Sequence, residues 1–228
     1  MAPQSKPPAD AFALARRRMV QEQLHRRGVR HPEVLESMGT VPREHFLTGS
    51  RSKDPIRAYA DTAIPVARGQ TLSQPYMVAR MTEALDPKPQ HRVLEIGTGT
   101  GYQTAVLARL VAEVWSVERD HYLADRARDR LKALGLENIH FQVGDGSLGW
   151  PDGAPYDGIL VTAAAPSIPR ALVGQLAPGG RLIIPVGPRE LQELLLIQEE
   201  DGELRTQVLM ECRFVPLVGQ EGWGGPTA

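Results

Sequence analysis

The sequence predicts an α/β fold, in which helices cover both faces of a doubly wound, mainly parallel β-sheet. Three observations support this prediction. The segment 11–90 is mainly helical in pattern, and in the segment 91–190 short apolar runs alternate with helical stretches, which is typical of a parallel sheet. In the segment 191–218 two apolar runs flank an Asp-Gly pair, which predicts a C-terminal β-hairpin.

Length and composition favour one folded domain. The chain has 228 residues, of which 42% are hydrophobic and 23% charged, close to ordinary globular usage. One domain over residues 11–228 is the expectation and two small domains are the alternative. The polar, proline-rich segment 1–10 is predicted to be a flexible leader, and it lacks the apolar core of a signal peptide.

Charge and cysteine usage restrict the partners and the location. Lys and Arg number 26 against 27 Asp and Glu, so the net charge of -1 disfavours nonspecific nucleic-acid binding. No run approaches the roughly 18 apolar residues of a membrane span. The single cysteine, Cys212, cannot form an internal disulfide, and no Cys/His pattern has zinc-ligand spacing. We therefore expect a cytoplasmic protein with no metal and no membrane partner.

The N-terminal elements follow from helical spacing of apolar residues. Residues 11–27 predict a helix that ends at Gly28, and residues 31–38 predict a second, short helix. Residues 41–64 are mixed and rich in turn formers. Residues 71–85 are again helical in pattern after Pro75.

The predicted sheet is made of short apolar runs. The expected strands are 92–96, 113–117, 139–143, 156–162 and 181–186, and the helices between them are 103–110, 121–134 and 169–176. The expected hairpin pairs residues 191–199 with 204–215 around Asp201-Gly202, because Asp-Gly supplies the backbone angles of a tight turn.

A glycine-rich turn follows the first strand and indicates a ligand site. Gly97, Gly99 and Gly101, with Thr98 between the first two, bring bare backbone close to a ligand. Their spacing is G-x-G-x-G rather than the dinucleotide pattern G-x-G-x-x-G. Glu95 precedes them, and its carboxylate would repel a pyrophosphate but suit an ammonium or sulfonium group. The alternative is that these glycines only shape a tight turn.

Acidic residues at the next two strand ends suggest a nucleoside. Glu118, at the end of the second strand, could accept both ribose hydroxyls, or it could be a solvated charge paired with Arg119 or Arg126. Asp145, followed by Gly146, could accept a hydrogen bond from an adenine amino group. Asp-Gly is also common in ordinary turns.

These residues resemble the class I S-adenosylmethionine-dependent methyltransferases, which have a Rossmann-like fold. More narrowly, residues 41–218 are similar to the protein-L-isoaspartate O-methyltransferase family. The similarity is carried by the glycine turn and by the segments VPREHF (41–46), QTLSQPYM (70–77), APYD (154–157), LAPGGRL (176–182), PVGP (185–188) and FVPL (214–217). The resemblance implies S-adenosylmethionine as methyl donor. It implies that the acceptor is the free α-carboxylate of L-isoaspartyl residues in damaged proteins and peptides, whose ester leads to repair through a succinimide.

The resemblance also assigns Ser73 to the active site. An α-carboxylate with a pKa of about 3.5 is already ionised at neutral pH and needs no general base. It does need a neutral hydrogen-bond donor, because burying an unpaired carboxylate costs several kcal/mol. Ser73 is the candidate hydrogen-bond donor. Gln70 and Thr71 are expected to line the same pocket and to contact the cofactor. The alternative is that Ser73 only caps the helix that follows.

Some residues are not included in the predicted active site, and others differ from the family pattern. Arg43 and His45 are left out of the predicted site, and residues 215–217 are either a substrate-binding edge or plain core. Val78 and Ser147 depart from the family pattern, so contacts with the adenine are not transferred in detail. Two other functions remain open: a methyltransferase for small molecules or nucleic acid, and a binding module without activity.

Overall fold

The structure, a computed structural model, describes residues 9–200 and 203–224. The chain divides into two compact units between Glu83 and Ala84. A single domain over residues 11–228 therefore stays a prediction, and each unit has its own architecture.

The first unit is mainly helical, as predicted. Helix α1 (Ala9–Arg18) continues as a π-helical stretch, Met19–Leu24, and a 3-10 turn, His25–Arg27. Gly28, with a φ of 97°, ends it in the left-handed conformation that favours glycine. Helix α2 (Pro32–Thr40) begins with a proline, which suits the first helical turn.

Short elements lead from α2 to the segment that contains Ser73. Helix α3 (Pro55–Ala58) is capped by the side chain of Asp54, and strands β1 (Ile64–Pro65) and β2 (Thr71–Leu72) form an antiparallel pair. Helix α4 (Pro75–Leu85) follows and crosses the division between the units. The helix thus begins at Pro75, and the two residues at the start of the predicted helical pattern are a strand instead.

The second unit is a seven-stranded, mostly parallel sheet, which confirms the predicted fold class. The strand order is β5-β4-β3-β6-β7-β8-β9. Strands β3 to β7 are parallel, whereas β8 and β9 are antiparallel additions. The strands are β3 (Arg92–Ile96), β4 (Glu113–Glu118), β5 (Ile139–Val143), β6 (Tyr156–Val161), β7 (Leu176–Val186), β8 (Gln192–Glu200) and β9 (Glu203–Cys212).

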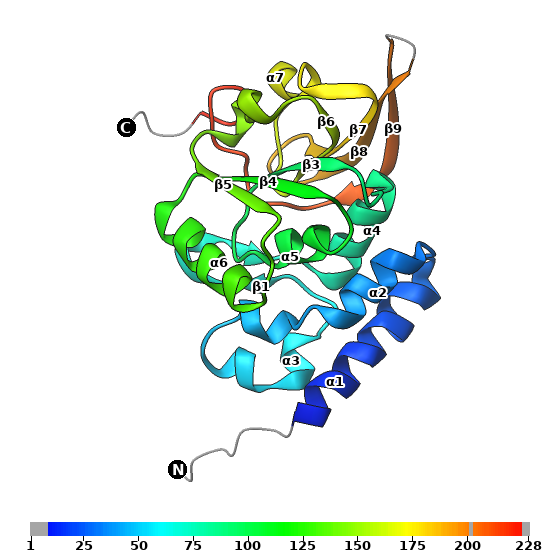
Figure 1. Cartoon of the computed structure of the whole chain (residues 1–228), viewed down its shortest axis with the longest axis vertical. Coiled ribbons are helices and arrows are strands. Elements are labelled where there is room, and N and C mark those ends of the chain that lie inside the picture. Colours follow the sequence, from blue (N-terminus) through cyan, green and yellow to red (C-terminus); the bar gives the residue numbers. More distant parts are fainter. Residues whose placement is uncertain (1–8, 201–202, 225–228) are drawn as a thin grey trace. The chain divides into compact units, whose positions relative to one another are not determined.

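Helices connect the parallel strands. Helices α5 (Tyr102–Ala108) and α6 (His121–Ala133) lie below the sheet in the view of Figure 1, and α7 (Arg170–Val173) lies above it. Helix α7 is shorter than predicted because β7 already begins at Leu176, opposite Tyr156 of β6. Strands β8 and β9 pair as the predicted hairpin, and Asp201-Gly202 lie outside the described residues.

The core of the second unit lies around its central strands. Leu94 and Ile96 of β3, Ile159 and Val161 of β6 and Leu182 of β7 are buried together. Such strands are apolar on both faces because helices cover the parallel sheet on both sides. In the described part of the chain, we find no helix with the length and apolar character needed to cross a bilayer.

Candidate active site

The glycine turn joins β3 to α5 in a conformation that requires glycine. Gly97, Gly99 and Gly101 have φ values of 94°, 55° and 92°. A Cβ atom on Gly97 would lie 2.4 Å from the Thr162 hydroxyl oxygen, so this residue is fixed by close packing. A Cβ on Gly99 would meet nothing nearer than a backbone oxygen at 4.0 Å. The turn is thus tight at Gly97 and open at Gly99, where a ligand can approach the backbone.

Glu95 lies fully buried in β3, just before the turn. Its Oε2 accepts hydrogen bonds of 2.6 Å from the hydroxyls of Thr104 and Ser116. Its Oε1 is buried and has no hydrogen-bond partner among the described residues. The Thr98 hydroxyl joins the same cluster, 2.6 Å from the Ser116 hydroxyl. An orphaned buried acceptor is costly, so this oxygen fits a cationic or hydrogen-bond-donating ligand.

Burial also changes the ionisation of Glu95. Loss of solvent raises the pKa of its carboxyl to about 8, against the opposing effect of hydrogen bonds from Ser116 and Thr104. The negative charge of Glu118 adds a smaller upward shift of the Glu95 pKa. At neutral pH the carboxyl therefore holds a proton in the free protein. A cation beside it would favour ionisation.

Glu118 ends β4 and its carboxylate reaches back to the glycine turn. Its Oε2 accepts a hydrogen bond of 2.8 Å from the Gly99 amide, and its Oε1 accepts one of 2.9 Å from the Asp120 amide. These contacts hold the carboxylate beside the turn and direct it toward backbone amides. Each carboxylate oxygen can accept a further hydrogen bond, so the group can still bind hydroxyls.

Asp145 follows β5 and is held by one neighbouring residue and by one far along the chain. Its Oδ1 accepts hydrogen bonds from the Ser147 amide and hydroxyl at 2.9 and 2.7 Å, and its Oδ2 accepts one of 2.7 Å from the Gln220 amide. A Cβ on Gly219 would lie 1.9 Å from Oδ1, so glycine is needed for this approach. Sequence reasoning missed the role of residues 219–220, since nothing local links them to Asp145.

Gly146 is fixed by packing rather than by backbone angles. A Cβ at this position would lie 2.5 Å from the Cγ2 atom of Ile96 in β3. The structure thus brings Glu95, the glycine turn, Glu118 and the Asp145-Gly146 pair to the carboxyl ends of β3, β4 and β5 in the second unit. This edge is where open α/β sheets bind ligands.

Gln70, Thr71 and Ser73 belong to the first unit. The Gln70 carbonyl accepts a hydrogen bond of 2.9 Å from the Val66 amide, and Thr71 pairs with Pro65 in the small sheet. Ser73 lies between β2 and α4.

The alternative role of Ser73 as a helix cap is not favoured by the geometry. The Gln74 carbonyl accepts the first helical hydrogen bond, from the Val78 amide at 3.1 Å. Gln74 therefore occupies the N-cap position, and Ser73 precedes it by one residue. The Ser73 carbonyl accepts a hydrogen bond of 2.7 Å from Arg43, which sequence reasoning had left out.

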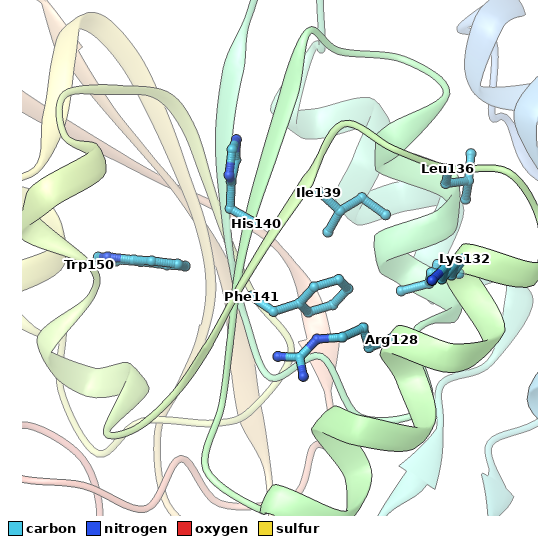
Figure 2. Close-up of a pocket in the computed structure, with 8 residues that line it drawn as sticks. Arg128, Lys132, Leu136, Ile139, His140, Phe141 and Trp150 are labelled. Carbon is cyan, nitrogen blue, oxygen red and sulfur yellow. The ribbon is translucent and has the colours of Figure 1, made fainter.

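A shallow groove of about 440 Å³ lies elsewhere in the second unit, along the edge strand β5 and helix α6. Figure 2 shows Ile139 and Phe141 directed toward α6, with His140 and Trp150 on the other side of the strand. No residue of the predicted site lines this groove. In the described ranges, no group of three or more His, Cys, Asp or Glu side chains could hold a metal ion.

Comparison with solved structures identifies the class of protein. A protein-L-isoaspartate O-methyltransferase aligns with a TM-score of 0.82 and 32% identity, covering 91% of this chain and 67% of that one. A Plasmodium falciparum structure, described as a beta-aspartate methyltransferase in complex with S-adenosyl-L-homocysteine, aligns with a TM-score of 0.76 and 26% identity over 90% of this chain and 99% of that one. With the glycine turn and its acidic neighbours, this fold defines an S-adenosylmethionine-dependent methyltransferase.

Sequence comparison narrows the class to a family. The model of the family Protein-L-isoaspartate(D-aspartate) O-methyltransferase (PCMT) matches residues 15–222. A protein-L-isoaspartate O-methyltransferase of Trichlorobacter lovleyi is 51% identical, over 93% of this chain and 97% of that protein. A protein-L-isoaspartate O-methyltransferase of Pseudomonas fluorescens is 53% identical, over 93% of this chain and 97% of that protein. The chain belongs to the protein-L-isoaspartate(D-aspartate) O-methyltransferase family.

Proposed function

We propose that this chain methylates the free α-carboxylate of L-isoaspartyl residues in damaged proteins and peptides. The observation that carries the proposal is the glycine turn with the orphaned oxygen of Glu95, in a chain that belongs to this family. The resulting ester can close to a succinimide, which reopens in part to normal aspartate. S-adenosylmethionine supplies an electrophilic methyl group bound to a positively charged sulfur.

The reaction balances without a proton transfer. The bond between sulfur and the methyl carbon breaks as the bond between a carboxylate oxygen and that carbon forms. One negative and one positive charge are neutralised, so the protein has only to align the reactants and exclude water. This agrees with a site made of backbone turns and hydrogen bonds.

The second unit supplies the residues proposed to bind the donor. Glu95 would accept its ammonium group, and Glu118 its ribose hydroxyls. Asp145 would accept the adenine amino group. The backbone of the glycine turn lets the donor approach, and the remaining proposed contacts come from Gly97, Thr98, Gly99, Gly101 and Gly146.

The first unit supplies the residues proposed to bind the acceptor. Ser73 would donate a neutral hydrogen bond to the acceptor carboxylate. A neutral donor orients this nucleophile without the strong charge pairing that would lower its reactivity. Gln70, which precedes β2, and Thr71, its first residue, line the same pocket and are proposed as further contacts of the methyl donor.

The proposed function is tested with a pair of peptides. Purified protein is incubated with labelled S-adenosylmethionine and either an L-isoaspartyl peptide or the same peptide with normal L-aspartate. We expect label only on the isoaspartyl peptide, as an ester that is lost at alkaline pH. Equal labelling of both peptides, or none, would refute the proposal. A binding measurement with S-adenosylhomocysteine then shows whether the donor site itself is intact.

We further propose a cytoplasmic location and no nucleic-acid partner. The net charge of -1 offers little attraction to a polyanion. The only cysteine, Cys212, is free and buried, and burial raises the pKa of its thiol to about 11, which suits an unreactive thiol in a reducing compartment.

A further inference from the structure

Arg43 lies fully buried in the first unit, within the 3-10 turn Arg43–Phe46. Its Nη2 donates a hydrogen bond of 2.7 Å to the carbonyl of Ser73, and its Nε donates one of 3.0 Å to the carbonyl of Ala58. The side chain thus ties together two segments that lie 30 and 15 residues further along the chain.

Burying a guanidinium has a substantial energetic cost. A charged group that is moved out of water loses its hydration, and hydrogen bonds within the protein must offset this loss. Arginine is suited to this position because its planar, rigid fork donates in two fixed directions and stays charged. The contact with Ser73 fixes the peptide group between Ser73 and Gln74, immediately before the start of α4.

We propose that Arg43 is a positioning residue for the methyl acceptor and acts through Ser73. By holding the Ser73 carbonyl, it fixes the backbone from which the Ser73 hydroxyl projects. Because Arg43 is fully buried, it acts on the acceptor only through the backbone of Ser73. The inference rests on the proposed function.

The neighbouring polar cluster provides a matched control. The Tyr59 hydroxyl accepts hydrogen bonds from the backbone amide of Arg43 at 3.2 Å and from the Arg16 side chain at 2.6 Å. It also donates to Glu44, which forms an ion pair of 3.0 Å with Arg16. Tyr59→Phe therefore disturbs the surroundings of Arg43 but leaves the bond from its guanidinium to Ser73 in place.

The test compares single variants of the full chain. For Arg43→Met we expect kcat/KM on the isoaspartyl peptide to fall about 10- to 100-fold, because the Ser73 hydroxyl would be slightly misplaced. The Kd for S-adenosylhomocysteine should change less than about twofold. Arg43→Lys keeps the charge but loses the fork, and should lie between Arg43→Met and the wild type. Tyr59→Phe should stay within about threefold of wild-type kcat/KM even if its melting temperature falls.

A double-mutant cycle separates positioning from general stability. In the Ser73→Ala background, Arg43→Met should lower kcat/KM by less than about threefold, because the residue through which it acts has gone. The inference would be overturned if Arg43→Met lowered kcat/KM by the same factor in the Ser73→Ala background as in the wild type. Wild-type activity in Arg43→Met or Arg43→Lys would overturn it too. If Arg43→Met does not fold, Arg43→Lys takes its place in the cycle. Absence of isoaspartyl methylation by the wild type would refute the proposed function instead.

Discussion

Replacing Glu95 by glutamine should remove a strong pH dependence of stability. The Glu95 pKa is about 8 in the folded chain, against 4.5 for an exposed glutamate. Between these values the folded chain holds one proton more than the unfolded chain. The contribution of this carboxyl to stability is therefore complete below pH 4.5 and is lost as the pH rises toward 8.

The dependence of the free energy of unfolding on pH follows from the one extra proton that Glu95 holds in the folded chain. The free energy of unfolding should fall by about 1.4 kcal/mol per pH unit from this group, which is about 3 kcal/mol between pH 5.5 and 7.5. Glutamine has nearly the same shape and is neutral at every pH. Its carbonyl oxygen can still accept the hydrogen bonds from Thr104 and Ser116. The other titrating groups contribute equally to both proteins and cancel in the difference.

The assay is urea unfolding of the wild type and Glu95→Gln at pH 5.5, 6.5 and 7.5, followed by circular dichroism. The stability of the variant relative to the wild type should rise by about 3 kcal/mol over this range. Parallel pH curves for the two proteins would show that Glu95 ionises normally and would refute the reasoning. A related measurement uses ligand binding: below pH 8, binding of S-adenosylhomocysteine should release a proton from Glu95, and calorimetry in buffers of different ionisation enthalpy detects it.

Three further substitutions test the donor site. Gly97→Ala should lower the free energy of unfolding by about 3 kcal/mol in urea titrations, because its Cβ would lie 2.4 Å from a neighbouring hydroxyl oxygen at a φ of 94°. Unchanged stability would mean that the turn can accommodate a side chain at position 97. Glu118→Gln should weaken S-adenosylhomocysteine binding about 10- to 100-fold, measured by calorimetry. The substitution removes a charged hydrogen-bond acceptor, and the NH2 group of the glutamine side chain can face the Gly99 amide, which is also a donor. Gly219→Ala should weaken the same binding about tenfold, because its Cβ would displace the Asp145 carboxylate from its present contacts. Equal affinity in Gly219→Ala and the wild type would exclude a part for the C-terminal segment in donor binding.

The parallel sheet was predictable because its signals are local. Strand β3 and the glycine turn lie within ten consecutive residues, and the glycine spacing itself indicates the backbone conformation. Strand β5 is likewise bounded by polar and turn-forming residues. Where a strand competes with a helix for the same residues, sequence pattern is a weaker guide. Leu176 fits the end of a helix, but pairing with Tyr156 draws it into β7.

The part of the site that escaped prediction depends on contacts between distant segments. Arginine is usually exposed, and nothing near Arg43 indicates that its partner is the carbonyl of Ser73. The amide of Gln220 reaches Asp145 across 75 positions of sequence. Such contacts arise only when the chain is folded, so residue spacing cannot reveal them.

The strand order leaves β5 and β9 as the two margins of the large sheet. The backbone groups of an edge strand can pair with an extended segment of another chain. Charged groups stand at both margins: Arg128 lies over Phe141 of β5, and Glu203 and Arg205 are exposed on β9. Charge along an edge opposes strand addition. These charged groups therefore disfavour the pairing of another chain's strand with either margin of the sheet.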